Sequence, residues 1–285
     1  MINPTEGQVT GDSKVCFERS RTGYVILTWN SESYISKCLN SIAKTKNNEE
    51  INIYIVDNGS CDSTAYYIDK WKETHPYINL YFWQNQYNLG TTVSRNIALR
   101  KAIKNNEYIC ILDSDTEINA EAIERMIQVL ADNKDIGIVG PVMRDYEGKI
   151  QNSGRALPTL KIKLMKILPF SKLRYLGESM EIIEKDKEIT DVGYLMSACW
   201  LLRSDNIEKI GLLDENIFYA PEDVEYCLRA WEKGFRVSYI NSVQIYHAWQ
   251  RLSRRKLFSR HNYEHIKGLM YLFWKYKFLF RARYP

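Results

Sequence analysis

Two aspartates separated by one residue come directly after an apolar segment. The segment YICIL (108–112) leads into Asp113, Ser114 and Asp115. Two carboxylates with this spacing, at the end of a buried strand, can hold a hard divalent cation whose other ligands are diphosphate oxygens. Phosphatases of the haloacid dehalogenase type also carry aspartates after a strand. Glu117 at the fifth position and the distance from the N-terminus disfavour that class. A pair of solvated surface aspartates is the plain alternative.

A second polar group follows the apolar run INIYIV (51–56). Asp57 and Asn58 place a carboxylate and an amide beside a glycine turn, which suits the edge of a nucleobase or the hydroxyls of ribose. The alternative is a simple turn followed by a helix cap at Asp62 or Ser63. We expect Asp62 and Ser63 to cap the helix and Asp57 to contact a ligand.

Two further acids, Glu222 and Asp223, lie in the first turn of a helix predicted from Pro221 to Lys233. Proline suits the first turn of a helix, and Gly234 suits the position just past its end. The helix dipole favours carboxylates in a first turn, so capping is the alternative to a chemical role for this pair.

The common phosphate-binding loops are absent from the sequence. There is no GxxxxGK motif, and YVILTWNSES (24–33) contains no glycine where a GxGxxG motif would follow the first strand. ATP-binding loops of this type and ordinary dinucleotide binding are therefore disfavoured.

Short apolar runs alternate with helical patterns through the first half of the chain. The runs span residues 24–28, 51–56, 78–83, 108–112 and 136–140. Apolar residues on both faces of strands joined by helical crossovers predict an α/β fold with a mostly parallel, Rossmann-like sheet flanked by helices. Ligands of such sheets bind at the carboxyl ends of the strands, which points to the loops after Leu27, Val56, Trp83 and Leu112.

The second half of the chain has fewer regular patterns. A hairpin is expected at YEGK (146–149), one strand over 192–202, and another over 235–240. Residues 157–190 lack clear periodicity and are interpreted as a variable or mobile region. No internal repeat or clear linker divides the chain.

Composition limits the class of protein. The 285 residues are 45% hydrophobic and 26% charged, which is typical of a folded globular chain. The longest nearly apolar run, Val192 to Leu202, is too short to cross a bilayer, and residues 1–20 lack the apolar stretch of a secretory signal. Six scattered cysteines without a CxxC pair argue against zinc and against a disulfide framework. These features predict a cytoplasmic protein.

The net charge of +4 is distributed unevenly. Residues 251–285 contain ten Lys or Arg and one acid, so the rest of the chain is acidic. A basic, aromatic tail on an acidic body indicates an anionic partner surface. The polybasic start and bulky aromatic centre of the tail favour a bilayer interface over nucleic acid.

Seven motifs in order resemble the family 2 inverting glycosyltransferases, and most closely the rhamnosyltransferase-like branch that builds bacterial surface polysaccharides. The resemblance covers roughly residues 24–255. The motifs are VILTWN (25–30), VDNGSCDST (56–64), NLGTTVSRN (88–96), ILDSDT (111–116), SACWLLR (197–203), GLLDENIFYAPEDVEYCLRAWEKGFRV (211–237) and VQIYHAW (243–249).

The resemblance implies a GT-A fold, a UDP- or dTDP-sugar donor, Mg²⁺ or Mn²⁺, and a single displacement at the anomeric carbon. Asp223 matches the catalytic base. Asp115 matches the direct metal ligand, and His247 matches a histidine that completes the metal site in some relatives. The positions that match or adjoin the nucleotide-sugar site are Thr28, Asn30, Asp57, Asn88, Arg95, Asp113, Ser114 and Asp115.

Two residues are assigned to the acceptor side, Glu222 and Trp200. The Trp200 ring is either a platform for an acceptor sugar or a core residue. DSDT stands where many members of the branch have NPDT, and Ser197-Ala198 where they usually have Gly-Ala. These departures bear on the donor sugar and the acceptor more than on the class of reaction.

The chemistry agrees with the resemblance. A sugar hydroxyl is a weak nucleophile, so a carboxylate must take its proton as the new bond forms. A leaving diphosphate needs a cation to offset its developing charge. A non-catalytic protein that binds nucleotide sugar or glycan at the membrane is the alternative function.

We expect an N-terminal extension (1–20), a GT-A domain (21–250) and a basic amphipathic C-terminal tail (251–285). The tail is expected to hold the protein on the inner face of the cytoplasmic membrane, close to a glycan or lipid-linked glycan acceptor. Alternatively, Leu269, Leu272, Phe273 and Tyr276, at helical spacing, pack on the body or form a homodimer contact. No nucleic-acid partner is expected.

Overall fold

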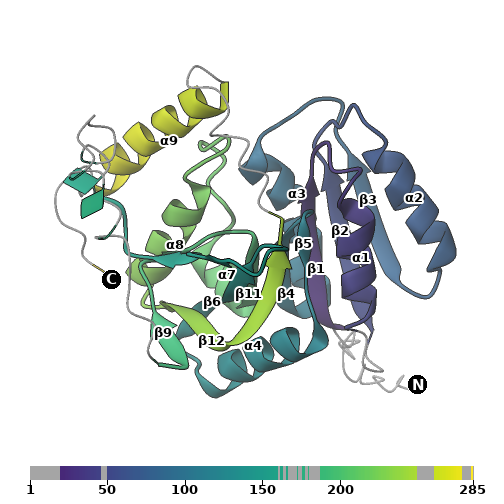
Figure 1. The fold of residues 1–285 in the computed structure, drawn as a ribbon, viewed down its shortest axis with the longest axis horizontal. Coiled ribbons are helices and arrows are strands. Elements are labelled where there is room, and N and C mark those ends of the chain that lie inside the picture. The colour runs from purple at the N-terminus through teal and green to yellow at the C-terminus, as the bar shows by residue number, and fades with distance from the viewer. Residues whose placement is uncertain are drawn as a thin grey trace, which may run out of the picture.

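A computed structural model describes residues 20–45, 50–159, 187–248 and 260–277, with a few positions between 160 and 186 and Tyr284. A ten-stranded mixed sheet forms its centre, with helices on both faces (Figure 1). The main path of the sheet runs β3-β2-β1-β4-β11-β6-β12-β5. The α/β fold with a largely parallel sheet is therefore confirmed. The expected N-terminal extension and most of the 157–190 region lie outside the described residues.

The N-terminal half is a run of parallel strands, as the alternating pattern predicts. Every residue of β2 is buried, because helices cover both faces of this part of the sheet. The strands are β1 (Ser20–Thr28), β2 (Ile51–Asp57), β3 (Asn79–Gln84) and β4 (Asn106–Asp113).

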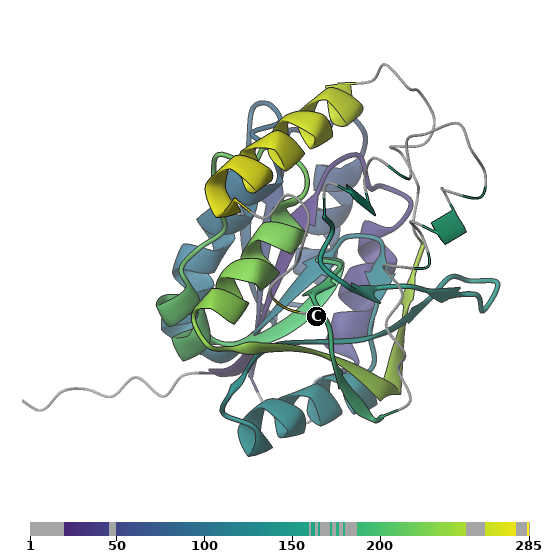
Figure 2. The same ribbon diagram turned by 90° about the vertical axis from the view of Figure 1, so that its left-hand side faces the viewer.

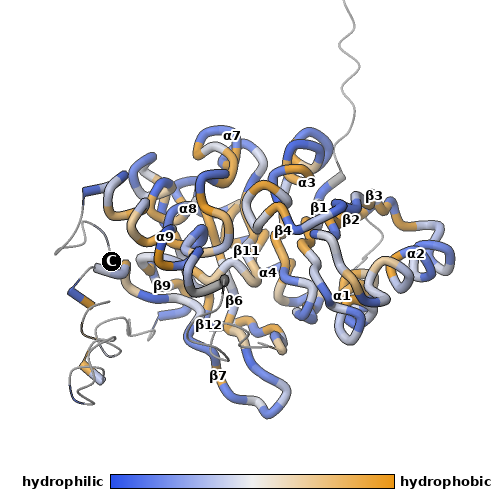
Figure 3. Tube along the Cα trace, turned by 90° about the horizontal axis from the view of Figure 1, so that it is seen from above, coloured by the Kyte–Doolittle hydropathy of each residue, from blue (hydrophilic) through white to orange (hydrophobic). Residues whose placement is uncertain are grey.

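Two hydrophobic clusters lie on the two faces of the sheet. One face carries α1 (Ile35–Ala43), α2 (Thr64–Thr74) and α4 (Ala120–Asp132). The other carries α3 (Thr91–Asn105), α7 (Ser204–Ile210), α8 (Glu222–Glu232) and α9 (Arg260–Tyr276). Figure 3 shows the hydrophobic segments gathered around the central strands β4 and β11, with hydrophilic turns at the periphery.

The second half of the sheet contains an antiparallel strand that the pattern does not predict. The expected strand over 192–202 is divided into β10 (Tyr194–Leu195) and β11 (Cys199–Arg203). Strand β11 inserts antiparallel between β4 and β6 (Ile136–Arg144). The short segment before β11 then lies beside the end of β4, where the amide of Asp113 donates to the carbonyl of Ala198 (3.1 Å).

The last long strand ends near the carboxyl end of β4. Strand β12 (Arg236–His247) runs parallel to β6 and pairs at its end with β5 (Thr116–Glu117), which places His247 opposite Thr116. The predicted hairpin is present, because β6 pairs with β7 (Ile150–Gln151). The remaining short strands are β8 (Gly154–Arg155), which pairs with β10, and β9 (Ile189–Asp191), which pairs with β12.

Trp200 is a core residue, so its assignment to the acceptor side is wrong. The side chain is 0% exposed on β11, its indole N–H donates to the carbonyl of Leu195 (3.1 Å), and its ring stacks on Tyr226. An aromatic ring enclosed in this way has no face left for a sugar.

The C-terminal helix packs on the body. In Figures 1 and 2 α9 lies beside α8, and Leu272 and Phe273 of α9 are buried in the same cluster as α8. Leu269 and Tyr276 are partly buried against that cluster. The apolar residues at helical spacing in the tail therefore form the inner face of α9, which packs on the body. This outcome agrees with the alternative given for the tail in the sequence analysis.

None of the helices in the part of the chain that the structure describes is long and apolar enough to span a membrane.

Candidate functional site

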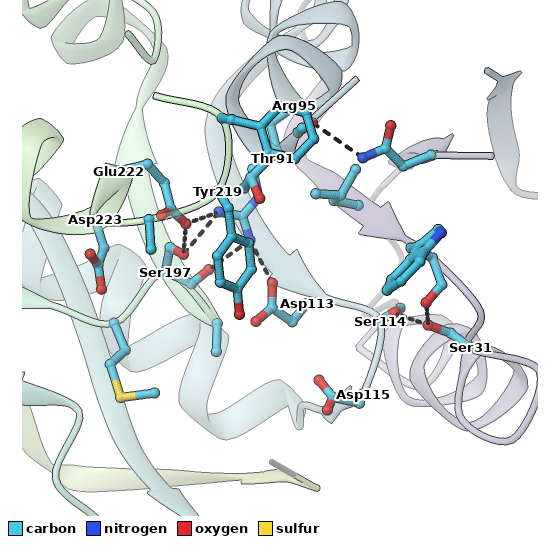
Figure 4. A pocket seen from close by; sticks show the side chains of 18 of the residues that line it. Ser31, Thr91, Arg95, Asp113, Ser114, Asp115, Ser197, Tyr219, Glu222 and Asp223 are labelled. Carbon is cyan, nitrogen blue, oxygen red and sulfur yellow. Dashed lines mark hydrogen bonds and ion pairs between the residues drawn. The ribbon is translucent and has the colours of Figure 1, made fainter. Parts of the chain in front are cut away.

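A cavity of about 350 Å³ opens at the carboxyl ends of β1 and β4, the edge where the fold predicts a ligand (Figure 4). It collects residues from both halves of the chain. The predicted site residues that line it are Asn88, Arg95, Asp113, Ser114, Asp115, Glu222, Asp223 and His247.

Arg95 on α3 connects the two groups of acids. The side chain is 2% exposed, and one of its terminal nitrogens lies 2.5 Å from Oδ1 of Asp113. The other donates to Oγ of Ser197 (2.9 Å) and lies 3.5 Å from Oε1 of Glu222. Figure 4 shows these contacts converging between the end of β4 and the start of α8. The arginine thereby fixes the spacing between the aspartate motif and the Glu222–Asp223 pair.

Asp113, Asp115 and His247 form a cluster suited to a metal ion. One ligand atom from each lies within 4.8 Å of the others, and Nε2 of His247 is 3.4 Å from Oδ1 of Asp115. Nδ1 of His247 is 2.7 Å from Oε1 of Gln151, an acceptor that fixes the ring and directs Nε2 toward the aspartates. Two carboxylates and an imidazole fit Mg²⁺ or Mn²⁺, and no thiolate is present in the cluster to favour zinc.

The electrostatics of this cluster favour a cation. Burial raises the pKa of Asp113, and the charge of Asp115 raises it further, while Arg95 opposes both effects. Burial alone would lower the pKa of His247, but the hydrogen bond and charge of Asp115, with the charge of Asp113, raise it. The shift of His247 reports the negative charge of the two aspartates, whereas the shift of Asp113 comes first from burial.

The two acids at the start of α8 have different surroundings. Burial, followed by repulsion from Asp223, raises the pKa of Glu222 to about 8. Arg95 lowers it less, because the guanidinium lies closer to Asp113 than to Glu222. Figure 4 shows Glu222 directed toward Arg95 and Ser197, with the Asp223 carboxylate on a different side of the helix start. Glu222 therefore binds its proton more tightly than an ordinary glutamate does.

The end of β2 contributes Asn58 to the cavity lining, and not the predicted Asp57. Asp57 does not line the cavity: it is fully buried and accepts hydrogen bonds from Ser60 and Gln84. Asp57 therefore orders the turn after β2, and its predicted contact with a ligand stays a prediction. The neighbouring amide of Asn58 lines the cavity instead and donates to Asn88 (2.9 Å).

Two other predicted nucleotide contacts lie just outside the cavity lining. Oγ1 of Thr28 is buried and has no hydrogen-bond partner among the described residues. Asn30 is exposed with φ of 50°, and its side chain accepts from the amide of Cys61 (2.9 Å). Their contacts with a donor stay predictions.

The predicted helix caps are confirmed in part. Asp62 accepts from the amide of Thr64 (3.0 Å), so it holds the chain at the start of α2. Ser63 occupies the cap position, but its side chain makes no capping hydrogen bond.

Aromatic residues of the cavity were not singled out from the sequence. Trp29 follows β1, and Phe218 and Tyr219 precede α8. Figure 4 shows the Tyr219 ring extending between Asp113 and the start of α8. Trp29 lies in the motif VILTWN (25–30), and Phe218 and Tyr219 lie in the motif over 211–237. Their place within these motifs is the sequence feature that could have predicted their position in the cavity.

The raised pKa of Glu222 predicts a pH dependence of stability. A pKa of about 8 in the folded state, against an ordinary 4.5, means that the folded protein binds an extra proton between these values. The free energy of unfolding should therefore fall as the pH rises from about 5 to about 8, with up to about 1.4 kcal/mol per pH unit from this group. We expect Glu222→Gln, which cannot ionise, to lose this contribution in urea unfolding across that range. Equal slopes for the two proteins would show that the pKa is not raised.

Comparisons with known proteins agree with this geometry. A family model described as glycosyl transferase family 2 matches residues 24–211. An N-acetylglucosaminyl-diphospho-decaprenol L-rhamnosyltransferase of Mycobacterium tuberculosis is 23% identical over 78% of this chain and 74% of its own length. The poly(ribitol-phosphate) beta-N-acetylglucosaminyltransferase TarS of Staphylococcus aureus is 24% identical, and the match covers 80% of this chain but 35% of TarS.

Solved structures share the fold. A mannosyltransferase of Pyrobaculum calidifontis, solved with GDP-Man and Mn²⁺, superposes with a TM-score of 0.63 at 18% identity, over 94% of this chain and 66% of that one. TarS residues 1–349 with UDP superpose with a TM-score of 0.54 at 20% identity, over 79% of this chain and 60% of that one. The fold is therefore GT-A. With a family model that matches most of its length, the chain belongs to glycosyl transferase family 2.

Proposed function

We propose that this glycosyltransferase moves a sugar, with rhamnose as one candidate, from a UDP or dTDP donor to a hydroxyl of a glycan or lipid-linked glycan, with inversion. One observation carries the proposal: a single cavity joins the Asp113, Asp115 and His247 cluster to the carboxylate of Asp223. Transfer from a sugar diphosphate needs these two features together. The rhamnosyl and N-acetylglucosaminyl transferases among the relatives support the class of donor.

The metal-ligating residues belong at the leaving group. Asp115 and His247, with Asp113 beside them, would hold Mg²⁺ or Mn²⁺ against the donor diphosphate. A bound cation supplies charge compensation for the diphosphate as the bond to the anomeric carbon breaks. Gln151 keeps the His247 ring oriented for this role.

Asp223 belongs at the acceptor. In a single displacement, the acceptor oxygen forms a bond to the anomeric carbon while the bond to the diphosphate oxygen breaks, and the hydroxyl proton passes to a base. Two adjacent carboxylates in an enclosed site do not both ionise easily, and burial together with repulsion from Asp223 raises the pKa of Glu222. The Asp223 carboxylate is then available as the base.

The alternative function, a non-catalytic protein that binds nucleotide sugar or glycan, is less well supported. Such a protein has no need of a base, and Asp223 and the aspartate motif are both present at the cavity. A measurement of sugar transfer distinguishes the two functions, because only the enzyme turns over its donor.

Asp223→Asn should abolish most of the transfer activity. The amide cannot accept the hydroxyl proton, so we expect kcat to fall by at least about 100-fold while donor affinity is retained. A thermal-shift screen of UDP- and dTDP-sugars identifies the donor for the assay. The matched control is Glu222→Gln, which should lower kcat less because the Glu222 carboxyl contacts Arg95 and Ser197 and is not the proposed base. Undiminished transfer by Asp223→Asn would refute the base assignment.

Donor binding should depend on a divalent metal. We expect chelation of Mn²⁺, or substitution of Asp115 or His247 by alanine, to weaken UDP or dTDP binding by about tenfold or more in calorimetric titrations. His75→Ala, on the C-terminal side of α2 and outside the cavity lining, is the control histidine and should leave affinity unchanged. Metal-independent binding and turnover would overturn the metal site.

The outer face of α9 is the part of the tail available to a membrane. Four large apolar side chains at helical spacing are 58–75% exposed, Lys267 lies among them at the same spacing, and the exposed Lys277 follows the end of the helix. The four are Tyr263, Ile266, Met270 and Trp274. Apolar and aromatic residues flanked by lysines suit an anionic bilayer interface. We therefore propose that α9 lies on the inner face of the cytoplasmic membrane through this side.

Charge substitutions on α9 test this docking face in the full-length protein. We expect Met270→Glu and Trp274→Glu to reduce co-sedimentation with phosphatidylglycerol-containing vesicles. Tyr66→Glu, at an exposed aromatic position on α2, should leave it unchanged. Truncation before α9 is a poor test because it removes Leu272 and Phe273 from the core. If the α9 variants bind vesicles normally but convert a dimer to a monomer, the face is a homodimer contact and the membrane proposal is wrong.

A further inference from the structure

A fully buried carboxylate, Glu225, connects the helix of the proposed base to the C-terminal helix. Its side chain is 0% exposed. Oε1 accepts hydrogen bonds from Tyr276 (2.7 Å) and Lys275 (2.8 Å) of α9. Oε2 accepts from Arg229, one turn later on α8 (2.9 Å). A carboxylate with three donors at these distances is a strongly held contact between two helices.

Glu225 and Asp223 lie on opposite sides of α8. Two residues along an α-helix correspond to a rotation of about 200°. Asp223 lines the cavity, while Glu225 faces α9. Arg95 and Ser197 contact Glu222 at the cavity end of the same first turn. The start of α8 is therefore held from the cavity side and from the α9 side.

Helix α9 also contacts the segment that leads into α8. A Cβ atom at Gly268 would lie 2.2 Å from the carbonyl oxygen of Ala220, so only glycine permits this approach. Further along α9, Lys275 and Tyr271 reach Asp214 at 2.6 and 2.9 Å. Asp214 does not line the cavity, whereas Ala220 does, so α9 contacts both the cavity wall and the segment behind it.

We propose that Glu225 is a positioning residue, which, through Lys275 and Tyr276, fixes α8 so that Asp223 reaches the acceptor hydroxyl. This inference rests on the proposed function of Asp223 as the base. Displacement of a reacting group by about 1 Å can cost about 100-fold in rate, so a small shift of α8 is enough to lower kcat. Donor binding depends on the other side of the cavity and is expected to be insensitive to that shift.

Two tyrosines on α9 provide a matched test. Tyr276→Phe removes the hydroxyl that donates to Glu225, whereas Tyr271→Phe removes an equivalent hydroxyl that donates to Asp214. We expect Tyr276→Phe and Glu225→Gln to lower kcat by about fivefold or more, a part of the loss that a 1 Å displacement produces, with donor KM within twofold of wild type. Tyr271→Phe should keep kcat within twofold.

A double-mutant cycle separates positioning from a general loss of structure. If Glu225 acts through Asp223, Glu225→Gln should cause no further loss of kcat when Asp223 is already asparagine. The inference is overturned if the losses multiply, if donor KM rises together with the fall in kcat, or if Tyr276→Phe behaves like Tyr271→Phe. If Glu225→Gln does not fold, the comparison of kcat for Tyr276→Phe and Tyr271→Phe tests the inference. Full activity of Asp223→Asn alone would instead overturn the proposed base, and this inference with it.

Discussion

The buried guanidinium of Arg95 contacts three other segments of the chain, and the arrangement of the site depends on it. It reaches from α3 to Asp113 at the end of β4, to Ser197 before β11, and to Glu222 at the start of α8. A buried cation is tolerated only where acids and acceptors surround it, and those acids in turn need the cation. The mutual requirement keeps the metal-ligating side of the cavity at a constant separation from the Glu222–Asp223 pair.

Two strand pairings set the remaining geometry. Antiparallel insertion of β11 brings Ser197 within reach of Arg95, and pairing of β12 with β5 brings His247 to Asp115. Helix α9 then closes the far side of α8, with its inner face in the core and its outer face carrying exposed apolar side chains. The same helix thus contacts the element that carries the proposed base and offers the surface proposed to meet the membrane.

Much of the fold could be predicted from local pattern. The runs at 24–28, 51–56, 78–83 and 108–112 correspond to β1 to β4, because apolar residues on both faces of a strand report burial without knowledge of its neighbours. The antiparallel direction of β11 could not be predicted, since 192–202 is almost entirely apolar and the break at Met196 to Ala198 depends on contacts with β4 and Arg95.

The sequence alone determined the family, the acids at the end of β4 and at the start of α8, and the helical spacing in the tail. These are properties of neighbouring residues and of motif order. Tertiary structure alone decided that Trp200 is core, that Asp57 supports a turn, that Asn58 lines the cavity, and which face of α9 is buried. The physical reason is that burial and charge pairing of these side chains depend on residues distant in sequence, such as Arg95 with Asp113 and Glu222, which only the packed sheet and helices bring together.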